Sequence, residues 1–502
     1  MQERVERRAT DAPKQQLDLT PRGRSHYERS VIDGAPQPQL DLNESRPPAG
    51  SGRSVAAAPA EGYARALVPQ LGAPAWILLA GGLLNSAGSG AVYPFIVIYL
   101  HGVRGFSFPV AGAIVAVFGA FTLVATPIAG EVVDRIDSRR TLVAALALLA
   151  AGYGAFAFVS SPWQGFACMA AAGLGNAAFY PAHTTLLVGL VPGAELTAVF
   201  GLGRVGHNLG MAAGGVAGGL IAVSSSPGTF TILFGLNAAS FLAFAAVAAG
   251  LPRVAAAPPA ADERRPGYRE VLRDRPFVAL IALNVVLVAG VMAQVETTLP
   301  AFAHRLGLDE RAIGGLFAVN MLLIVVFQLP VLRLVEGRRR ARVVALGAVA
   351  YAIGAAGALA VGLSWRSGAA GAGLVAVMVV YTVGELLHAP TQSALAADLA
   401  PAPLRGRYMS LVTCSYALGF TLGPALGGIL LGRSPALLWG VAAILAVVAA
   451  AGFVALDQIV PAEARLVPAR TPRPELLSRP RRRAASAVVR RVARPAAVQP
   501  EG

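Results

Sequence analysis

Long apolar runs alternate with short polar breaks between residues 75 and 456. About 20 apolar residues of helix are needed to cross the hydrocarbon core of a bilayer. Helices are the expected form, because lipid offers no water to backbone polar groups. The pattern predicts twelve membrane-spanning helices. Their expected ranges are 75–100, 109–133, 140–160, 163–191, 197–223, 229–251, 277–303, 311–335, 342–363, 369–399, 406–432 and 435–456.

The predicted spans form two sets of six, 75–251 and 277–456, separated by a polar linker at 252–276. The two sets share an arginine pair before the third and ninth spans, a proline in the fourth and tenth, and a glycine motif in the fifth and eleventh. These are Arg139-Arg140 and Arg339-Arg340, Pro181 and Pro390, and Gly210-x3-Gly214-Gly215-x2-Gly218-Gly219 and Gly419-x3-Gly423-Pro424-x2-Gly427-Gly428. Such duplication is typical of transporters whose halves surround a central site.

The glycines of the repeated motif recur every four residues, which places them on one face of each helix. Without side chains on that face, two helix backbones approach closely in lipid. Pro424 removes a backbone hydrogen bond and allows a bend. We therefore expect a packing seam, which is either static or slides during a conformational change.

Arginines concentrate on one side of the predicted bundle. If both termini are cytoplasmic, the inner loops contain sixteen arginines and the outer loops contain five. Basic loops favour the cytoplasmic side of a membrane. We therefore expect a multi-pass protein of the plasma membrane with both termini in the cytoplasm.

The composition narrows the class of protein further. The chain has 502 residues, of which 55% are hydrophobic and 14% charged, whereas a soluble domain carries about 25% charged residues. The net charge of +15 lies mainly in loops and the tail, so no nucleic-acid partner is expected. The two cysteines, Cys168 and Cys414, exclude a disulfide scaffold. The sequence indicates no metal site and no cofactor.

Residues 1–74 and 457–502 lack apolar periodicity, and we expect a disordered cytoplasmic leader and a basic disordered cytoplasmic tail. The leader does not have the short apolar run of a secretory signal. Arginines cluster in the tail at 479–483 and 490–491. They either touch anionic lipid or are solvated.

The loop after the second predicted span contains Gly130-x3-Asp134-Arg135-x-Asp137-x-Arg139-Arg140. This run resembles the signature G-x3-D-R-x-G-R-R of the major facilitator superfamily, with Asp137 in place of the second glycine. The glycine motifs resemble the antiporter motif G-x3-G-P-x2-G-G of that family. Gly215 replaces the proline in the fifth span, and the eleventh-span copy is complete. The resemblance covers residues 75–456.

This resemblance implies an all-α membrane fold of twelve helices in two six-helix halves. It also implies a cytoplasmic latch between the halves, formed by Gly130, Asp134, Arg135 and Arg139, with Asp134 facing the eleventh span. Met169 stands where the family often has an arginine in the fourth span. By the same resemblance, spans one, four, seven and ten line a central cavity.

Two carboxylates, Glu385 and Glu296, lie within predicted spans ten and seven. Ionisable side chains inside a membrane are rare and usually functional. Glu385 falls near the middle of the bilayer and Glu296 in its outer half. Both are candidates for proton coupling, and the alternative for each is a structural hydrogen bond or an arginine partner.

Further polar side chains are candidates for contact with a substrate in the cavity. They are Asn85, Tyr93, Asn176, Gln294, Tyr381, Arg204 and His207. Arg204 pairs with a carboxylate, binds an anionic substrate or extends to the inner interface. His207 either titrates near neutral pH or packs as a neutral side chain. The run Gly201-x-Gly203-x2-Gly206 opens a membrane span and does not follow a strand, so it does not indicate a dinucleotide site.

These features predict a secondary active transporter and not an enzyme. The favoured function is proton-coupled export of small organic molecules or drugs by a monomer that alternates access between the two sides. One alternative is uptake or facilitated diffusion of a metabolite. Another class, a non-transporting sensor or a membrane-embedded enzyme, stays open, although the sequence shows no nucleophile–base pair for an enzyme.

Overall fold

The computed structural model describes residues 71–135, 137–192, 195–252, 268–364, 368–401 and 404–467. By its contacts the chain divides after Tyr63, and the described residues all belong to the second unit, Ala64–Gly502. The predicted leader up to residue 70, most of the linker and the tail beyond residue 467 lie outside the described residues. The fold below is that of the second unit.

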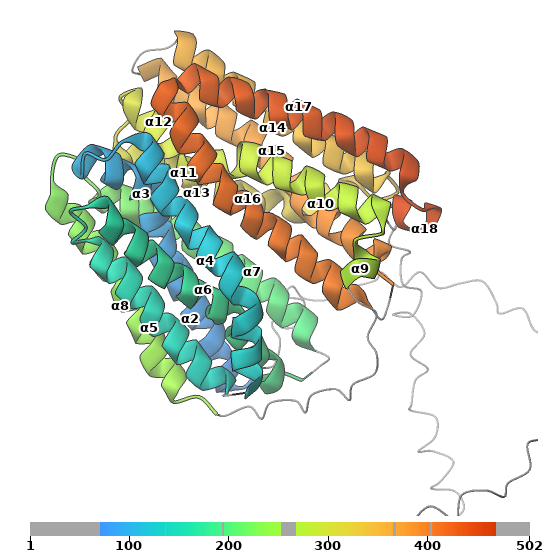
Figure 1. Ribbon diagram of the computed structural model, residues 1–502, viewed down its shortest axis with the longest axis horizontal. Coiled ribbons are helices and arrows are strands. Elements are labelled where there is room, and N and C mark those ends of the chain that lie inside the picture. Colours follow the sequence, from blue (N-terminus) through green and yellow to red (C-terminus); the bar gives the residue numbers. More distant parts are fainter. Residues whose placement is uncertain are drawn as a thin grey trace, which may run out of the picture. The chain divides into compact units, whose positions relative to one another are not determined.

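The first set of helices follows the first six predicted spans (Figure 1). The bounds are α2 Ala73–Val92, η1 Tyr93–Phe95, α3 Ile96–Ile98, η2 Tyr99–Val103, α4 Phe108–Arg135, α5 Ser138–Phe156, α6 Pro162–Leu190, α7 Leu196–Ile221 and α8 Pro227–Ala249. α2 packs against α7 and α8, and α5 packs against α6 and α8. α6 and α8 each begin with a proline in the first turn. Proline is tolerated at this position because the backbone N–H groups of the first turn have no partner within the helix.

The second set follows the last six predicted spans. The bounds are α9 Tyr268–Val271, α10 Arg275–Leu287, η4 Val288–Met292, α11 Ala293–Thr297, α12 Leu299–Arg305, α13 Glu310–Leu334, α14 Arg340–Ser364, α15 Gly368–Leu399, α16 Arg405–Arg433, α17 Pro435–Ile459 and α18 Ala462–Arg465. Asp274 and Asp309 cap the starts of α10 and α13, since their carboxylates accept from Phe277 N at 3.3 Å and Ala312 N at 2.9 Å. α14 packs between α15 and α17.

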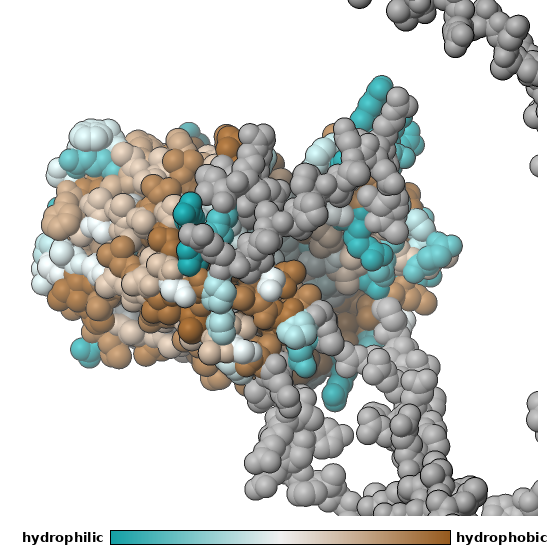
Figure 2. Space-filling model, turned by 90° about the horizontal axis from the view of Figure 1, so that it is seen from below, coloured by the Kyte–Doolittle hydropathy of each residue, from teal (hydrophilic) through white to brown (hydrophobic). Residues whose placement is uncertain are grey.

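The observed helices confirm a multi-pass, all-helical membrane protein, and their ends lie within four residues of the predicted spans. Nine helices of the described residues are long and apolar enough to cross a membrane, and the other three long helices are α5, α6 and α7. The full count of twelve spans stays a prediction. Large apolar side chains on the outside support burial in lipid: Val124 is 72% exposed and Ile444 is 64% exposed. Apolar residues also cover much of the flank seen in Figure 2.

The first helix of each set is broken at a proline. Tyr93 and Pro94 begin a short 3-10 segment after α2, and Pro300 follows the break between α11 and α12. Proline removes a backbone donor and bends a helix. Each broken helix ends before a glycine with positive φ, Gly105 at 73° and Gly307 at 91°, a conformation that favours glycine. The two sets therefore share the same local breaks, as a duplicated chain would.

The last helix extends beyond its predicted end, which corrects the start of the tail. α17 reaches Ile459 because Asp457 is buried and accepts hydrogen bonds from Arg339 at 2.9 Å and Arg342 at 2.8 Å. After α18, Leu466 forms an isolated antiparallel bridge with Arg339. A charged residue thus does not end the span, because arginines at the start of α14 neutralise it.

Candidate functional site

The glycine motif of α7 packs against two different helices, one on each of two faces. Gly210, Gly214 and Gly218 pack against α2, where a Cβ on Gly210 would stand 2.8 Å from the Ser86 Cβ. One position further on, Gly219 faces α13, where a Cβ would stand 2.5 Å from the carbonyl oxygen of Glu310. The first three glycines thus hold a helix of the same set, and the last holds a helix of the other set.

The motif of α16 repeats this arrangement. Gly419, Gly423 and Gly427 pack against η4 and α11, where a Cβ on Gly419 would stand 2.5 Å from the Val288 Cβ. Pro424 and Gly428 face α4, and a Cβ on Gly428 would stand 3.1 Å from the Gly112 Cα. The expected packing seam is therefore present in both motifs, and it also joins the two sets through α4–α16 and α7–α13 (Figure 1).

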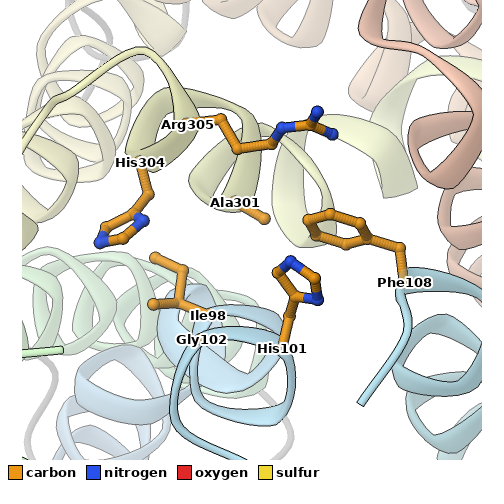
Figure 3. Close-up of a pocket in the computed structure, with 7 residues that line it drawn as sticks. All are labelled: Ile98, His101, Gly102, Phe108, Ala301, His304 and Arg305. Atoms are coloured by element: carbon orange, nitrogen blue, oxygen red, sulfur yellow. The ribbon is translucent and has the colours of Figure 1, made fainter. Parts of the chain in front are cut away.

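Polar contacts join the two sets at the end where α12 and η2 lie. The Ser224 backbone nitrogen donates to Glu310 Oε1 at 2.9 Å, and His304 Nε2 lies 3.1 Å from Ser224 Oγ. Figure 3 shows a small pocket here, between η2 with the start of α4 and α12. Arg305 lies over the Phe108 ring at 5.4 Å, and His101 stacks on the same ring. These contacts close this end of the interface, which we call the sealed end.

Two carboxylates of the second set lie away from the sealed end. Glu296 on α11 and Glu385 on α15 are both half-buried, and their charges interact. Asn320 on α13 donates to Glu385 Oε2 at 3.1 Å and to Thr382 Oγ1 at 2.9 Å. The hydrogen bond orients Glu385.

The first set places one positively charged side chain and one neutral polar side chain near these carboxylates. Arg204 on α7 is exposed, and its charge interacts with that of Glu385. Tyr93, at the break after α2, is half-buried and lies within electrostatic range of Glu296. Glu296, Glu385, Arg204 and Tyr93 therefore form a chain of electrostatic neighbours that spans the two sets.

The other predicted cavity residues occupy different environments. His207 is exposed, and its Nδ1 lies 2.8 Å from the Ser86 hydroxyl. Asn85 is buried, and neither atom of its amide has a partner among the described residues. Tyr381 is buried against Tyr351 with ring centroids 5.0 Å apart, and Asn176 is half-buried on α6. His207 lies within electrostatic range of Arg204.

Gln294 is placed in helix packing and not on an open cavity surface. It is 1% exposed, and its Nε2 donates to the carbonyl oxygens of Ala289 at 2.7 Å and Gly423 at 2.9 Å. Its Oε1 accepts from Thr298 at 3.1 Å. Gln294 thus fastens α11 to the glycine seam of α16.

We expect Gln294→Leu to lower the stability of the protein by roughly 1–3 kcal/mol, because two buried carbonyls lose their donor. Gln328→Leu is the matched control, since the Gln328 Nε2 is buried and donates no hydrogen bond to a described residue, so the change removes no such bond within the protein. Thermal unfolding in detergent, followed by tryptophan fluorescence, measures both. Equal midpoints for the two variants would contradict the bracing role.

The predicted cytoplasmic latch is described in part. Gly130, Asp134 and Arg135 belong to α4, but their side chains lie outside the described residues. Arg139 donates to the carbonyl oxygen of Leu251 at 2.8 Å, which keeps it within the first set. Asp137, in place of the family glycine, caps α5 by accepting from the Arg139 backbone nitrogen at 3.2 Å. The departure from the signature is thus explained by a helix cap.

Sequence reasoning did not assign several polar residues around Glu385 to the site, and it read His388 as a packing residue. Tyr351 on α14 and Tyr416 on α16 lie within electrostatic range of Glu385, and His388 and Gln392 are fully buried on α15. The signal was present in α15, because positions 381, 385, 388 and 392 share one helical face. In the described residues, no three His, Cys, Asp or Glu side chains form a group able to hold a metal ion.

A bundle of long apolar helices in two similar sets, with ionisable side chains between them, has the architecture of a membrane transporter. The family profile described as "Major Facilitator Superfamily" matches residues 78–386 and 297–496. The chain therefore belongs to the Major Facilitator Superfamily, which confirms the resemblance seen in the sequence.

Curated relatives are transporters and not enzymes. The MFS-type transporter YhjO of Bacillus subtilis (strain 168) is 25% identical over 362 residues, which cover 72% of this chain and 86% of that protein. The multidrug resistance protein MdtH of Cronobacter sakazakii is 27% identical over 326 residues, or 63% and 78% of the two chains.

Solved structures show the same fold. A peptide transporter of the POT type has a TM-score of 0.66 at 18% identity, and the match covers 81% of this chain and 99% of that one. The nucleoside transporter NupG has a TM-score of 0.65 at 16% identity, with 76% and 99% covered. At these identities the likeness concerns the fold alone.

Proposed function

We propose that this protein is a monomeric, proton-coupled exporter of small organic molecules in the plasma membrane. The two sets of helices, 75–251 and 277–456, are the halves that move against each other. The observation that carries the proposal is that Glu296 and Glu385 of the second half lie within electrostatic range of Tyr93 and Arg204 of the first. The similarity to a multidrug resistance protein supports the same function.

Protonation at this site changes the attraction between the halves. An ionised Glu385 attracts Arg204 across the interface, and a protonated Glu385 does not. A cationic substrate competes with the proton for the same carboxylates. Binding of either ligand is thus linked to the contact between halves, which is the requirement for alternating access.

The sealed end is the extracellular one in this proposal. The described loops and helix ends on that side carry Arg104, Arg305, Arg311 and Arg433, whereas most other arginines outside the spans lie at the opposite end. Both termini are then cytoplasmic, and the structure is a conformation closed to the outside. Two carboxylates and several tyrosines around one arginine favour lipophilic organic cations as substrates.

Transport by everted membrane vesicles tests the direction and the coupling. Vesicles from cells that produce the protein are expected to accumulate tritiated tetraphenylphosphonium when respiration acidifies their interior. An uncoupler should collapse the accumulation, because proton release from the vesicle drives entry of the cation. Vesicles from cells without the protein are the control.

Other outcomes correspond to the alternative functions. Accumulation that an uncoupler does not change would indicate facilitated diffusion. Accumulation only in right-side-out vesicles would indicate uptake. No transport of any tested cation, anion or neutral metabolite in either kind of vesicle would contradict a transporter and favour a sensor.

A further inference from the structure

A buried polar cluster lies behind Glu385, on the side that belongs to the second half. His388 and Gln392 follow Glu385 on α15 by three and seven residues, so the three share a helical face. Both His388 and Gln392 are 0% exposed. The face continues from Glu385 for about 10 Å toward the end of α15 at Leu399, away from the sealed end.

Close packing of α14 and α15 builds the walls of this cluster. A Cβ on Gly347 would stand 3.2 Å from the His388 backbone nitrogen, and one on Gly384 would stand 2.8 Å from the Tyr351 ring. The glycines therefore let the two backbones approach and bring Tyr351 to His388, with ring centroids 6.0 Å apart. Tyr416 of α16 lies 6.4 Å from His388.

Four polar atoms of the cluster have no hydrogen-bond partner among the described residues. They are Nδ1 and Nε2 of His388, Nε2 of Gln392 and the hydroxyl of Tyr351. Buried polar atoms in proteins almost always have a partner, either protein or ordered water. Four such atoms in one buried cluster therefore form a set suited to ordered water, not to apolar packing.

The cluster extends from Glu385 past His388 to a half-exposed residue. The Tyr416 hydroxyl donates to Gln392 Oε1 at 3.4 Å, and Tyr416 is half-buried. The titratable groups that face His388 are Glu385 on its own helix, Tyr351 on α14 and Tyr416 on α16, while α17 presents Phe453. The route thus runs among α14, α15 and α16, whereas Arg204 approaches Glu385 from the other half.

We infer that His388 is the relay of a proton route between Glu385 and the cytoplasm, separate from the path of the substrate. The inference rests on the proposed proton coupling and adds the route of the proton. A neutral imidazole has one N–H donor and one acceptor nitrogen, so it accepts a proton on one side and releases one on the other.

In the release step, the carboxylic O–H bond of Glu385 breaks and an N–H bond forms at one nitrogen of His388. The N–H bond at the other nitrogen breaks, and that proton passes to a water that Gln392 and Tyr416 would hold. This water releases a proton of its own to the cytoplasmic water and so stays neutral. Glu385 is left as a carboxylate, and a flip of the ring restores the first tautomer. This route lets the proton leave while a substrate occupies the space between the halves.

Proteoliposomes containing the full chain test the relay with tritiated tetraphenylphosphonium as the probe. Two rates are compared, uptake driven by a pH gradient and exchange across the membrane without a gradient. We expect His388→Gln to slow driven uptake by about tenfold or more and to leave exchange within about twofold of wild type, because exchange needs no net proton movement. Gln392→Leu should show the same split.

His183→Gln is the matched control, since His183 Nε2 contacts the Leu78 carbonyl oxygen at 3.2 Å within the first half. Both rates should stay near wild type there. If His388→Gln retains driven uptake, the relay is overturned, but the proposed function is not. Loss of both rates in His388→Gln and in Gln392→Leu would also overturn it, because the residues would then serve packing. A wild-type protein without gradient-driven uptake would overturn the proposed function, and the relay with it.

Discussion

Glu385→Gln is expected to abolish gradient-driven transport while the protein still exchanges substrate across the membrane. The amide keeps an oxygen that accepts the hydrogen bond from Asn320, so the local structure is retained. It has no ionised form, however, and therefore resembles a permanently protonated Glu385. The attraction to Arg204 is lost, and no proton is exchanged at this position.

The expected loss in driven uptake is at least about a hundredfold, the size typical for removing a group that transfers a proton. Uptake of labelled tetraphenylphosphonium into proteoliposomes measures it, with exchange as the second readout. Glu463→Gln is the matched control, because Glu463 is exposed on α18. Undiminished driven uptake by Glu385→Gln would remove Glu385 as the coupling residue and leave Glu296 as the remaining candidate.

Gly314→Ala is expected to prevent closure of the sealed end. Gly314 of α13 faces the α7 seam, and an added Cβ would contact the Gly215 carbonyl oxygen and stand 3.1 Å from the Gly219 Cα. These are backbone atoms, which cannot rotate away. Overpacking of this kind costs about 1–3 kcal/mol. Because the contact exists in the sealed conformation, the conformational equilibrium should shift by roughly 5–150-fold toward opening at this end.

Gly315→Ala supplies the control one residue away, since nothing lies within 4 Å of a Cβ built there. Spin labels on cysteines at Gly228 and Arg433, in a protein whose Cys168 and Cys414 are replaced by serine, report the distance between halves at this end. We expect a longer distance and slow transport for Gly314→Ala, and wild-type values for Gly315→Ala. Identical distance distributions for the two variants would contradict the role of the seam in closure.

The helices of this protein follow from its sequence because each one must satisfy its own backbone in lipid. Apolar length, proline starts and aspartate caps mark the ends, and the glycine motifs at 210–219 and 419–428 identify the seams. Glu296 and Glu385 stand out in the same way, because ionisable side chains in an apolar run are rare and usually functional. These features depend on local sequence alone.

The remaining features depend on which helix faces which. Gln294 looks like a cavity residue until the neighbouring carbonyls of Ala289 and Gly423 are seen to use its amide. Tyr351 lies on α14, outside the helices expected to line the cavity, yet Gly347 and Gly384 bring it to His388. From the sequence, Asp457 is the first residue of the predicted tail, and only the fold reveals its two arginine partners. The hydropathy of these apolar helices does not show which neighbouring helix a given side chain faces.

The short segment after α17 has a practical consequence for anyone who shortens or tags the chain. Val467 donates to the carbonyl oxygen of Arg338, and Arg340 donates to that of Leu466 at 3.0 Å, so this segment stitches the loop before α14 to the end of the bundle. A deletion from residue 460 onward would remove the Leu466 carbonyl oxygen, one of the acceptors of the buried Arg340. A fluorescent protein or affinity tag joined after Val467 leaves that stitch intact, and residue 468 is therefore the earliest safe place for a cut.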